Sequence, residues 1–220
     1  MRDVPTLDHE QALWQAGYRS VAGVDEAGRG PLAGPVVAAA VALPVNASLP
    51  WLAQVRDSKQ LTPRQRAVLA ERIQAEALAV GVGILESEAI DAVGIRVASL
   101  QAMGLALARL RPAPDFALVD GRDRLDLELP HTPVVRGDAR CVSVAAASIV
   151  AKVTRDRIME DLDGRYPDWG FARHKGYPTA EHLALLATRG PTPVHRRSFL
   201  PVREALRRLL TTERTESTER

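Results

Sequence analysis

Cysteine is almost absent, because Cys141 is the only one among 220 residues. A lone cysteine cannot form an internal disulfide, and it cannot supply the thiolate ligands of a structural zinc site. The sequence therefore predicts a core held together by packing, in a reducing compartment. Cys141 itself is interpreted as a small buried apolar residue.

Long hydrophobic runs are also missing. The longest apolar stretch, residues 31–45, is short for a bilayer and is interrupted by Pro35 and Pro44. The N-terminus lacks the basic start and apolar run of a signal peptide. We therefore expect a soluble, cytoplasmic protein that has no membrane contact.

Excess charge of either sign is small. The 29 Lys and Arg residues against 27 Asp and Glu give a formal net charge of +2, with a pI near 9.0. Bulk charge therefore says nothing about nucleic acid, and any site for a polyanion must come from local clustering. With 46% hydrophobic and 25% charged residues, the chain has the composition of an ordinary globular protein.

Apolar runs bounded by glycine, proline or aspartate predict strands, and three- and four-residue spacing of apolar positions predicts helices between them. The expected strands are residues 20–28, 36–43, 80–85, 116–121 and 133–137. The expected helices begin at Pro63 after a Thr62 cap, cover residues 88–110 and 142–162, and follow Thr179 and Pro201.

Interleaved strands and helices predict an α/β fold, with a sheet covered by helices and a helical C-terminal extension. We expect one domain over residues 1–210, of which about 165–210 form the helical part. Residues 211–220, TTERTESTER, have almost nothing to bury and are predicted to be disordered.

Carboxylates stand where several predicted strands end, which is where active sites collect in α/β proteins. They are Asp25, Glu26, Asp120 and Asp138. Asp120 and Asp138, taken singly, are equally typical of turns. The adjacent acids Asp25 and Glu26 are harder to explain structurally, because they repel each other at the edge of an apolar segment.

Oxygen ligands without accompanying histidine or cysteine suit Mg²⁺ or Mn²⁺ and not zinc. A cluster of four carboxylates would raise its own pKa values unless divalent cations neutralised it. Two such ions could position a water and stabilise the charge that gathers on phosphorus. The pattern therefore favours hydrolysis of a phosphodiester.

Five segments resemble the signature of the ribonuclease HII family, in the family's order. They are residues 24–36 (VDEAGRGPLAGPV), 57–61 (DSKQL), 119–121 (VDG), 137–153 (GDARCVSVAAASIVAKV) and 174–177 (HKGY). The resemblance implies a ribonuclease H-like fold, with a central mixed five-stranded sheet flanked by helices. It also implies a monomeric endonuclease that cuts the RNA strand of RNA/DNA hybrids and cleaves 5′ of single ribonucleotides in duplex DNA.

The implied chemistry uses two divalent ions, Mn²⁺ or Mg²⁺, and leaves a 3′-hydroxyl and a 5′-phosphate, with roles in ribonucleotide excision repair and RNA primer removal. The residues that resemble the family's metal ligands are Asp25, Glu26, Asp120 and Asp138. Those that resemble its substrate contacts are Gly28, Arg29, Gly30, Lys59, Ser143, Ser148, Lys152 and Tyr177. The Gly28 to Gly30 turn would read the 2′-hydroxyl, and Tyr177 would pack against the next sugar.

Several of these residues also have a structural interpretation. Ser143 and Ser148 lie in an alanine-rich helix, where small residues commonly serve close packing. Asp156 is the acid most easily mistaken for a further ligand, and we interpret it as an ion-pair partner within or between helices. Residues 174–175 and 195–197 form basic patches that would touch a duplex backbone or remain plain surface.

A dinucleotide-binding protein is a competing interpretation from a different class, because residues 28–34 follow a strand and resemble a glycine-rich phosphate loop. Residues 27–56 contain no Asp or Glu, so the acid that would hold a ribose hydroxyl is missing. Asp25 and Glu26 would also repel a pyrophosphate. This pattern argues against a dinucleotide site.

Three further protein classes with a related fold are alternatives. The four carboxylates argue against a nucleic-acid-binding module without chemistry, and the turn with Tyr177 argues against a Holliday-junction nuclease. The sister ribonuclease HIII family carries an additional N-terminal substrate-binding domain, whereas only residues 1–19 precede the first predicted strand. Ribonuclease HII therefore remains the preferred interpretation.

Overall fold

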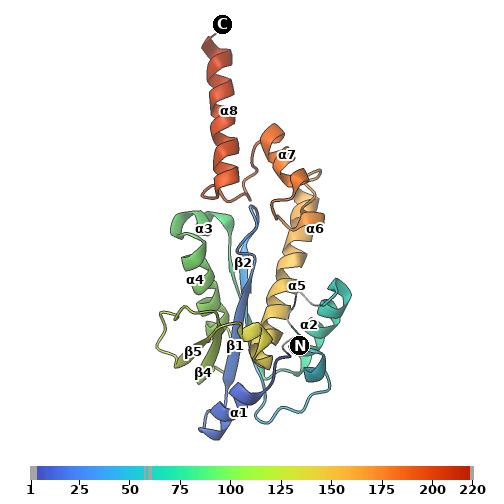
Figure 1. Ribbon diagram of the computed structural model, residues 1–220, viewed down its shortest axis with the longest axis vertical. Coiled ribbons are helices and arrows are strands. Elements are labelled where there is room, and N and C mark those ends of the chain that lie inside the picture. The colour runs from blue at the N-terminus through green and yellow to red at the C-terminus, as the bar shows by residue number, and fades with distance from the viewer. Residues whose placement is uncertain (1–3, 57, 59–60, 219–220) are drawn as a thin grey trace.

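The computed structural model describes residues 4–56, 58 and 61–218, and within them a five-stranded sheet has the order β3-β2-β1-β4-β5 (Figure 1). The strands are β1 (Val21–Ala27), β2 (Val36–Ala42), β3 (Ala79–Leu85), β4 (Phe116–Asp120) and β5 (His131–Val134). Strand β2 runs antiparallel to β1 and β3, whereas β4 runs parallel to β1 and β5. The expected mixed sheet of five strands is confirmed.

The helices in the described residues lie on both faces of the sheet and beyond one end of it (Figure 1). They are α1 (Asp8–Gln15), α2 (Pro63–Glu76), α3 (Ser87–Val93), α4 (Ile95–Ala108), α5 (Val142–Arg165), α6 (Phe171–His174), α7 (Ala180–Arg189) and α8 (Leu200–Thr218), with short 3₁₀ turns η1 (Leu52–Gln54) and η3 (Gly137–Ala139). None of these helices is long and apolar enough to cross a membrane.

Alternation along the strands divides the core between two faces of the sheet. In β2, Ala39 and Val41 pack in the cluster with α2 and α5, whereas Ala38 and Ala40 pack in the cluster with α4. Fully burying one Val, Leu or Ile side chain contributes roughly 1.5–3 kcal/mol, so these two clusters dominate the stability of the fold. Cys141 is fully buried in the first cluster, as expected.

Helix α5 approaches strand β1 backbone to backbone. A Cβ atom added at Gly23 would lie 2.2 Å from the backbone of Ser143 and Val144, so only glycine fits there. On the opposite face, a Cβ at Gly83 would lie 2.0 Å from the Ala102 carbonyl oxygen of α4. Small residues thus allow both helices to pack tightly on a sheet that contains few aromatic side chains.

A third apolar cluster joins the loop after β1 to the C-terminal helices. Its buried members are Leu32, Ala33, Met159, Leu162, Trp169, Phe171, Leu186, Val202 and Ala205. They come from the segment before β2, from the second half of α5, from residues 169–171 and from α7 and α8. The C-terminal helices are therefore anchored next to the 28–30 turn.

Helix starts follow the predicted caps. The Thr62 side chain accepts a hydrogen bond from the Gln65 N–H, and the Gln65 side chain accepts one from the Thr62 N–H, which completes a capping box before Pro63. The Thr179 hydroxyl caps α7 by accepting from the His182 N–H. Both signals were readable because they depend only on neighbouring residues.

Two boundaries differ from the prediction. The expected helix over residues 88–110 is broken at Gly94, whose φ of 80° is left-handed and separates α3 from α4. Strand β5 is shifted to His131–Val134 from the expected residues 133–137, and it ends before Arg136, which also has a left-handed φ of 58°.

Helix α8 continues to Thr218, past Thr211, the point from which the sequence predicts disorder. Glutamate, arginine and threonine do not terminate a helix that is already nucleated, and no glycine or proline interrupts this segment. Figure 1 shows α8 projecting from the end of the molecule where α3 and α7 lie.

Candidate active site

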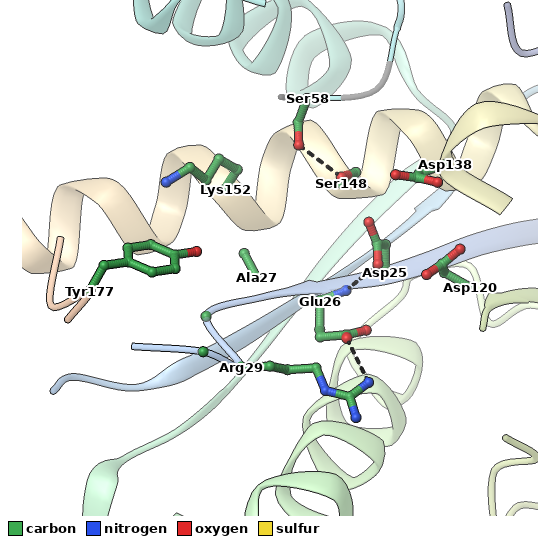
Figure 2. A pocket seen from close by; sticks show the side chains of 12 residues that line it. Asp25, Glu26, Ala27, Arg29, Ser58, Asp120, Asp138, Ser148, Lys152 and Tyr177 are labelled. Atoms are coloured by element: carbon green, nitrogen blue, oxygen red, sulfur yellow. Dashed lines mark hydrogen bonds and ion pairs between the residues drawn. The ribbon is translucent and has the colours of Figure 1, made fainter. Parts of the chain in front are cut away.

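A pocket lies at the carboxyl ends of β1 and β4 and is bordered by α5 (Figure 2). Its lining contains all four predicted carboxylates and most of the predicted substrate contacts. The lining residues are Asp25, Glu26, Ala27, Gly28, Arg29, Gly30, Ser58, Asp120, Asp138, Ser148, Lys152 and Tyr177.

Strand register brings the carboxylates together. Val24 of β1 pairs with Val119 of the parallel strand β4, so Asp25 and Asp120 follow at equivalent positions on neighbouring strands. Asp138 lies in η3, which follows the next parallel strand, β5. Parallel strands end at the same edge of a sheet, and this topology collects acids that are far apart in the sequence.

The environment of Asp25 opposes its charge. Burial raises the pKa of Asp25 well above its usual range, and the Glu26 and Asp120 carboxylates raise it further. The Ser148 hydroxyl and the Glu26 backbone N–H act in the opposite direction, and the latter donates to Asp25 at 2.7 Å. These donors do not compensate for burial, so the ionised site needs additional positive charge.

Glu26 and Asp120 have different partners. Burial raises the pKa of Glu26, although Arg29 opposes this by an ion pair of 3.2 Å. Asp120 accepts a hydrogen bond of 2.7 Å from the Gly137 N–H, which ties the end of β4 to η3. In Figure 2 the Asp25, Asp120 and Asp138 side chains lie close to one another beside α5.

The carboxylate oxygens of the pocket suit a hard divalent cation as ligands. The acidic side chains of the lining offer carboxylate oxygens, and the raised pKa of Asp25 indicates a site that lacks positive charge. As arranged, no group of three or more His, Cys, Asp or Glu side chains in the described part of the chain already has metal-site spacing. Glu26 is turned toward Arg29, so the carboxylates must reorient to enclose an ion.

Residues 28–30 form a turn that also lines the pocket. Gly28 has a left-handed φ of 99°, which lets the chain turn directly after β1. Gly30 does not have a positive φ, and a Cβ there would lie 3.7 Å from Tyr177 Cε1, with no closer neighbour among the described residues. The protein itself therefore leaves open space at Gly30 beside the Tyr177 ring.

Helix α5 contributes Ser148 and Lys152 to the pocket, as predicted. The Ser148 hydroxyl is 3.1 Å from the Ser58 hydroxyl, and Lys152 donates to Asp156 at 2.6 Å. Ser58 was missed as a pocket residue, although it belongs to the DSKQL motif, because a loop sequence does not indicate side-chain direction. Lys59, also predicted, lies outside the described residues.

Ser143 is not in the pocket, and its prediction as a phosphate contact is wrong. It is fully buried, and both its N–H and its hydroxyl donate to Glu10 of α1, at 2.8 and 2.6 Å. The Glu10 carboxylate thereby occupies the N-terminus of α5, where the helix dipole favours negative charge. A phosphate has no access to a donor that an internal carboxylate already uses.

The C-terminal basic patches are mostly internal. His174, His195 and Arg196 are 8%, 1% and 0% exposed, so they are neither duplex contacts nor plain surface. The interpretation of Asp156 as an ion-pair partner is confirmed, because it pairs with Lys152 at 2.6 Å and with Arg66 at 3.8 Å.

Known proteins resemble the chain over most of its length. A model of the family "Ribonuclease HII" matches residues 22–202. The ribonuclease HII of Geobacillus thermodenitrificans is 54% identical over 200 residues, which cover 91% of this chain and 76% of that protein. The ribonuclease HII of Geobacter sulfurreducens is 51% identical over 199 residues and 90% of each chain.

Solved structures agree in fold. The ribonuclease H2 of Pyrococcus horikoshii superposes with a TM-score of 0.75 at 31% identity, covering 86% of this chain and 98% of that one. Ribonuclease HII of Archaeoglobus fulgidus, solved in complex with PCNA, gives a TM-score of 0.66 at 30% identity, covering 80% and 92%. A ribonuclease HIII in complex with Mn²⁺ supports the fold alone, with a TM-score of 0.64 at 23% identity over 89% of this chain and 71% of that one.

The sheet order, the acid pocket and these matches agree with one another. The fold is ribonuclease H-like. The chain therefore belongs to the ribonuclease HII family and is an endoribonuclease that acts on RNA/DNA hybrids.

Proposed function

We propose that the enzyme also cuts on the 5′ side of a single ribonucleotide embedded in duplex DNA, leaving a 3′-hydroxyl and a 5′-phosphate. The observation that carries this proposal is the pocket that joins four carboxylates to the 28–30 turn and Tyr177. An acidic cluster alone supports hydrolysis of any phosphodiester. The adjoining turn adds a surface that can select the sugar.

Selection of ribose is supported by the open space at Gly30. Neither backbone conformation nor packing against the described residues requires glycine at this position. A sugar can therefore lie against the turn, where backbone groups reach its 2′-hydroxyl, the group that distinguishes RNA from DNA. Tyr177, with 42% of its surface exposed, offers a ring for the neighbouring sugar.

Phosphate positioning is assigned to Ser148 and Lys152 on α5, and to Lys59 from the sequence motif. A hydroxyl and an ammonium group hold a phosphodiester without reading its sequence. The Lys152 side chain is 22% exposed, and its ion pair with Asp156 holds the ammonium group at the edge of the pocket. These contacts would fix the scissile bond relative to the acids.

Asp25, Glu26, Asp120 and Asp138 are assigned as ligands of two divalent cations, Mn²⁺ or Mg²⁺. When bound, such ions lower the pKa of a water and stabilise the attacking and leaving oxygens of an in-line displacement. The protein's own contribution is to keep the ligands together and to offset part of the cost of their burial. Register holds Asp25 beside Asp120, and donors from Ser148 and Glu26 favour the ionised form of Asp25.

This activity would place the protein in ribonucleotide excision repair and in removal of RNA primers. We propose that it acts as a monomer in the cytoplasm, on RNA/DNA hybrids and on DNA that contains ribonucleotides. The proposal does not depend on a protein partner, because every assigned residue belongs to this chain.

A strand-specific cleavage assay tests the proposal. Duplexes with one central ribonucleotide are incubated with the enzyme, with Mn²⁺, with Mg²⁺ or with chelator, and the cut is mapped at nucleotide resolution. We expect metal-dependent cleavage at the bond 5′ of the ribonucleotide, a ligatable 3′-hydroxyl, and no product with chelator.

An all-DNA duplex and a four-way DNA junction serve as matched controls. Cleavage of either at a rate similar to that of the ribonucleotide-containing duplex would contradict selection of the sugar. Cleavage of continuous hybrids with no cutting at single ribonucleotides would restrict the function to hybrid degradation.

A further inference from the structure

Two buried arginines lie beneath the segment of residues 28–35, which contains the 28–30 turn. Arg155 of α5 is 1% exposed, and Arg196, in the loop before α8, is 0% exposed. Neither forms an ion pair with a carboxylate in the part of the chain that the structure describes. Their donors are instead directed at backbone carbonyl oxygens.

Arg196 binds both ends of the 28–35 segment. Its guanidinium donates to the carbonyl oxygens of Gly28 at 2.7 Å, Arg29 at 3.1 Å, Gly34 at 3.0 Å and Pro35 at 3.0 Å. The two ends of the segment are therefore held to one planar group. Such a fork has a fixed geometry that lysine cannot reproduce.

Arg155 connects this segment to the one that carries Tyr177. It donates to the Pro35 and Ala33 carbonyl oxygens at 3.0 and 3.1 Å and to the Lys175 carbonyl oxygen at 3.0 Å. The Leu32 N–H adds a bond of 2.8 Å to the Gly176 carbonyl oxygen. Arg155 thus fixes the two substrate-facing segments relative to each other.

Arg155 also restricts which residue type can occupy position 28. A Cβ at Gly28 would lie 2.1 Å from Arg155 Nε, so the turn rests directly on this side chain. At Gly30, by contrast, no part of either arginine is within 4 Å of an added Cβ. Gly28 is therefore restricted both by its left-handed φ of 99° and by Arg155, whereas neither restriction applies to Gly30.

We propose that Arg155 and Arg196 are positioning residues for ribonucleotide recognition, acting through the 28–35 backbone and not on the substrate itself. The proposal rests on the proposed function, because it requires the 28–30 turn to read the 2′-hydroxyl. A recognition surface must be held to within a fraction of an ångström to discriminate, and the two guanidinium groups provide that constraint. The Lys152 ammonium group, which is assigned to phosphate positioning, donates to Asp156 and to no atom of the 28–35 segment that the arginines hold.

The test uses Arg196→Lys and Arg155→Lys in the full-length, metal-loaded enzyme. For each variant, KM and kcat are measured on the duplex with one ribonucleotide, and the inhibition constant Ki is measured for the same duplex made only of DNA. We expect the ratio of Ki to KM to fall by about ten- to a hundredfold, with Ki changed less than twofold, because misplacement of about 1 Å has that cost.

Met103→Ala provides a matched control for loss of stability. Met103 of α4 is 2% exposed in the cluster on the other face of the sheet, away from the 28–35 segment, and its truncation creates a cavity there. It should lower the melting temperature without changing the ratio of Ki to KM. A role of the arginines in stability alone would make their variants behave like this control.

Two further results separate the hypotheses. If the wild-type enzyme does not distinguish the two duplexes, the proposed reading of the 2′-hydroxyl fails before any variant is made. If the wild type distinguishes them and a folded Arg196→Lys keeps the same ratio, the positioning proposal is overturned while the proposed function stands.

Hydrogen exchange in the wild-type enzyme guards against variants that fail to fold. The Leu32 and Gly34 amides bond to Gly176 and Val194, and we expect them to exchange as slowly as amides of the sheet. Rapid exchange at these two amides would show that the segment is not held and would overturn the proposal.

Discussion

Two buried charged clusters border the 28–30 turn, namely the arginine pair Arg155 and Arg196 and the carboxylates around Asp25. The protein neutralises the charge of the arginines more fully than that of Asp25. Arg155 and Arg196 donate to carbonyl oxygens of the 28–35 segment, so the backbone itself compensates their charge. The Asp25 carboxylate has fewer donors. Asp25 accepts from the Glu26 N–H, while burial and neighbouring carboxylates raise its pKa.

The difference separates a structural site from a reaction site. A buried charge is tolerated when hydrogen bonds or opposite charges surround it, and the arginines meet that condition within the protein. Burial lowers the pKa of Arg155 to about 10 and that of Arg196 to about 9, and both remain protonated near neutral pH. Under the proposed function, the acid cluster would be neutralised by cations that it binds from outside.

Removing one acid should have the largest effect on activity. Asp25→Asn is expected to lower kcat/KM by about a thousandfold or more, since roughly 4 kcal/mol of transition-state stabilisation depends on the ions it holds. The melting temperature without metal should stay the same or rise, because repulsion with Glu26 and Asp120 is removed. Steady-state kinetics and thermal melts measure both effects.

Asp161→Asn, at an exposed position on α5, is the control for loss of a carboxylate and should change neither quantity. An Asp25→Asn enzyme that retained wild-type turnover would exclude Asp25 from the reaction.

The glycines of the turn sharpen the contrast, because a Cβ at Gly28 would meet Arg155, whereas a Cβ at Gly30 would meet only the Tyr177 ring among the residues that the structure describes. Gly30→Ala should leave the melting temperature within about 2 °C of wild type and reduce cleavage at a single ribonucleotide by about ten- to a hundredfold. Gly28→Ala should lower the melting temperature clearly, because its Cβ would lie 2.1 Å from Arg155 Nε.

Thermal melts and single-ribonucleotide cleavage distinguish the two glycine variants. Equal destabilisation by both substitutions would mean that Gly30 also serves packing. Full activity of Gly30→Ala would remove that position from sugar recognition.

Metal binding should stabilise the protein through the carboxylate cluster and independently of the two arginines. At a concentration near 100 times Kd, Mn²⁺ or Mg²⁺ adds about 2.7 kcal/mol, which corresponds to a rise in melting temperature of roughly 5–10 °C for a domain of this size. Asp120→Asn should remove most of this rise, whereas Arg155→Lys should preserve it. A similar shift in the Asp120→Asn protein would place the ion elsewhere.

Acid pH should lower the stability of the protein through two buried histidines near Arg196. They are His182 and His195, whose Nε2 atoms are 2.9 Å apart. Burial lowers the pKa of His182, and burial together with His182 lowers the pKa of His195 to about 3. The contribution of His195 to stability is therefore complete above about pH 6.5, the unfolded value, and is lost as the pH falls toward about 3, and His182 acts in the same direction.

Between about pH 6.5 and 5, His195 alone should cost about 2 kcal/mol, or roughly 4–8 °C in melting temperature. His195→Gln should reduce this pH dependence, as measured by thermal melts at constant ionic strength. A slope identical to that of wild type would show that His195 titrates normally.

Local signals in the sequence predicted much of the fold. The Thr62 cap, the apolar strands and the long helix over α5 depend on neighbours within a few residues, and they were predicted close to their true positions. The break at Gly94 was missed because glycine is tolerated inside many helices, so its left-handed conformation could not be read from the helical pattern.

The site was predicted less evenly. The four carboxylates and the turn belong to motifs next to strand ends, and the structure brings them into one pocket. Ser143 carried the same motif signal but points to Glu10, which is 133 positions away in the sequence. A motif identifies which residues are special and does not reveal which side of a helix faces a ligand.

The amino-acid sequence by itself determined the helix caps, the alternation of the strands and the presence of acids at the strand ends, because these follow from short-range conformational preferences. Only the tertiary structure decided that Arg155 and Arg196 are internal supports and that Glu10 occupies the start of α5. A charged side chain has the same identity on a surface or in a core. Its role is fixed by partners that folding brings from distant parts of the chain.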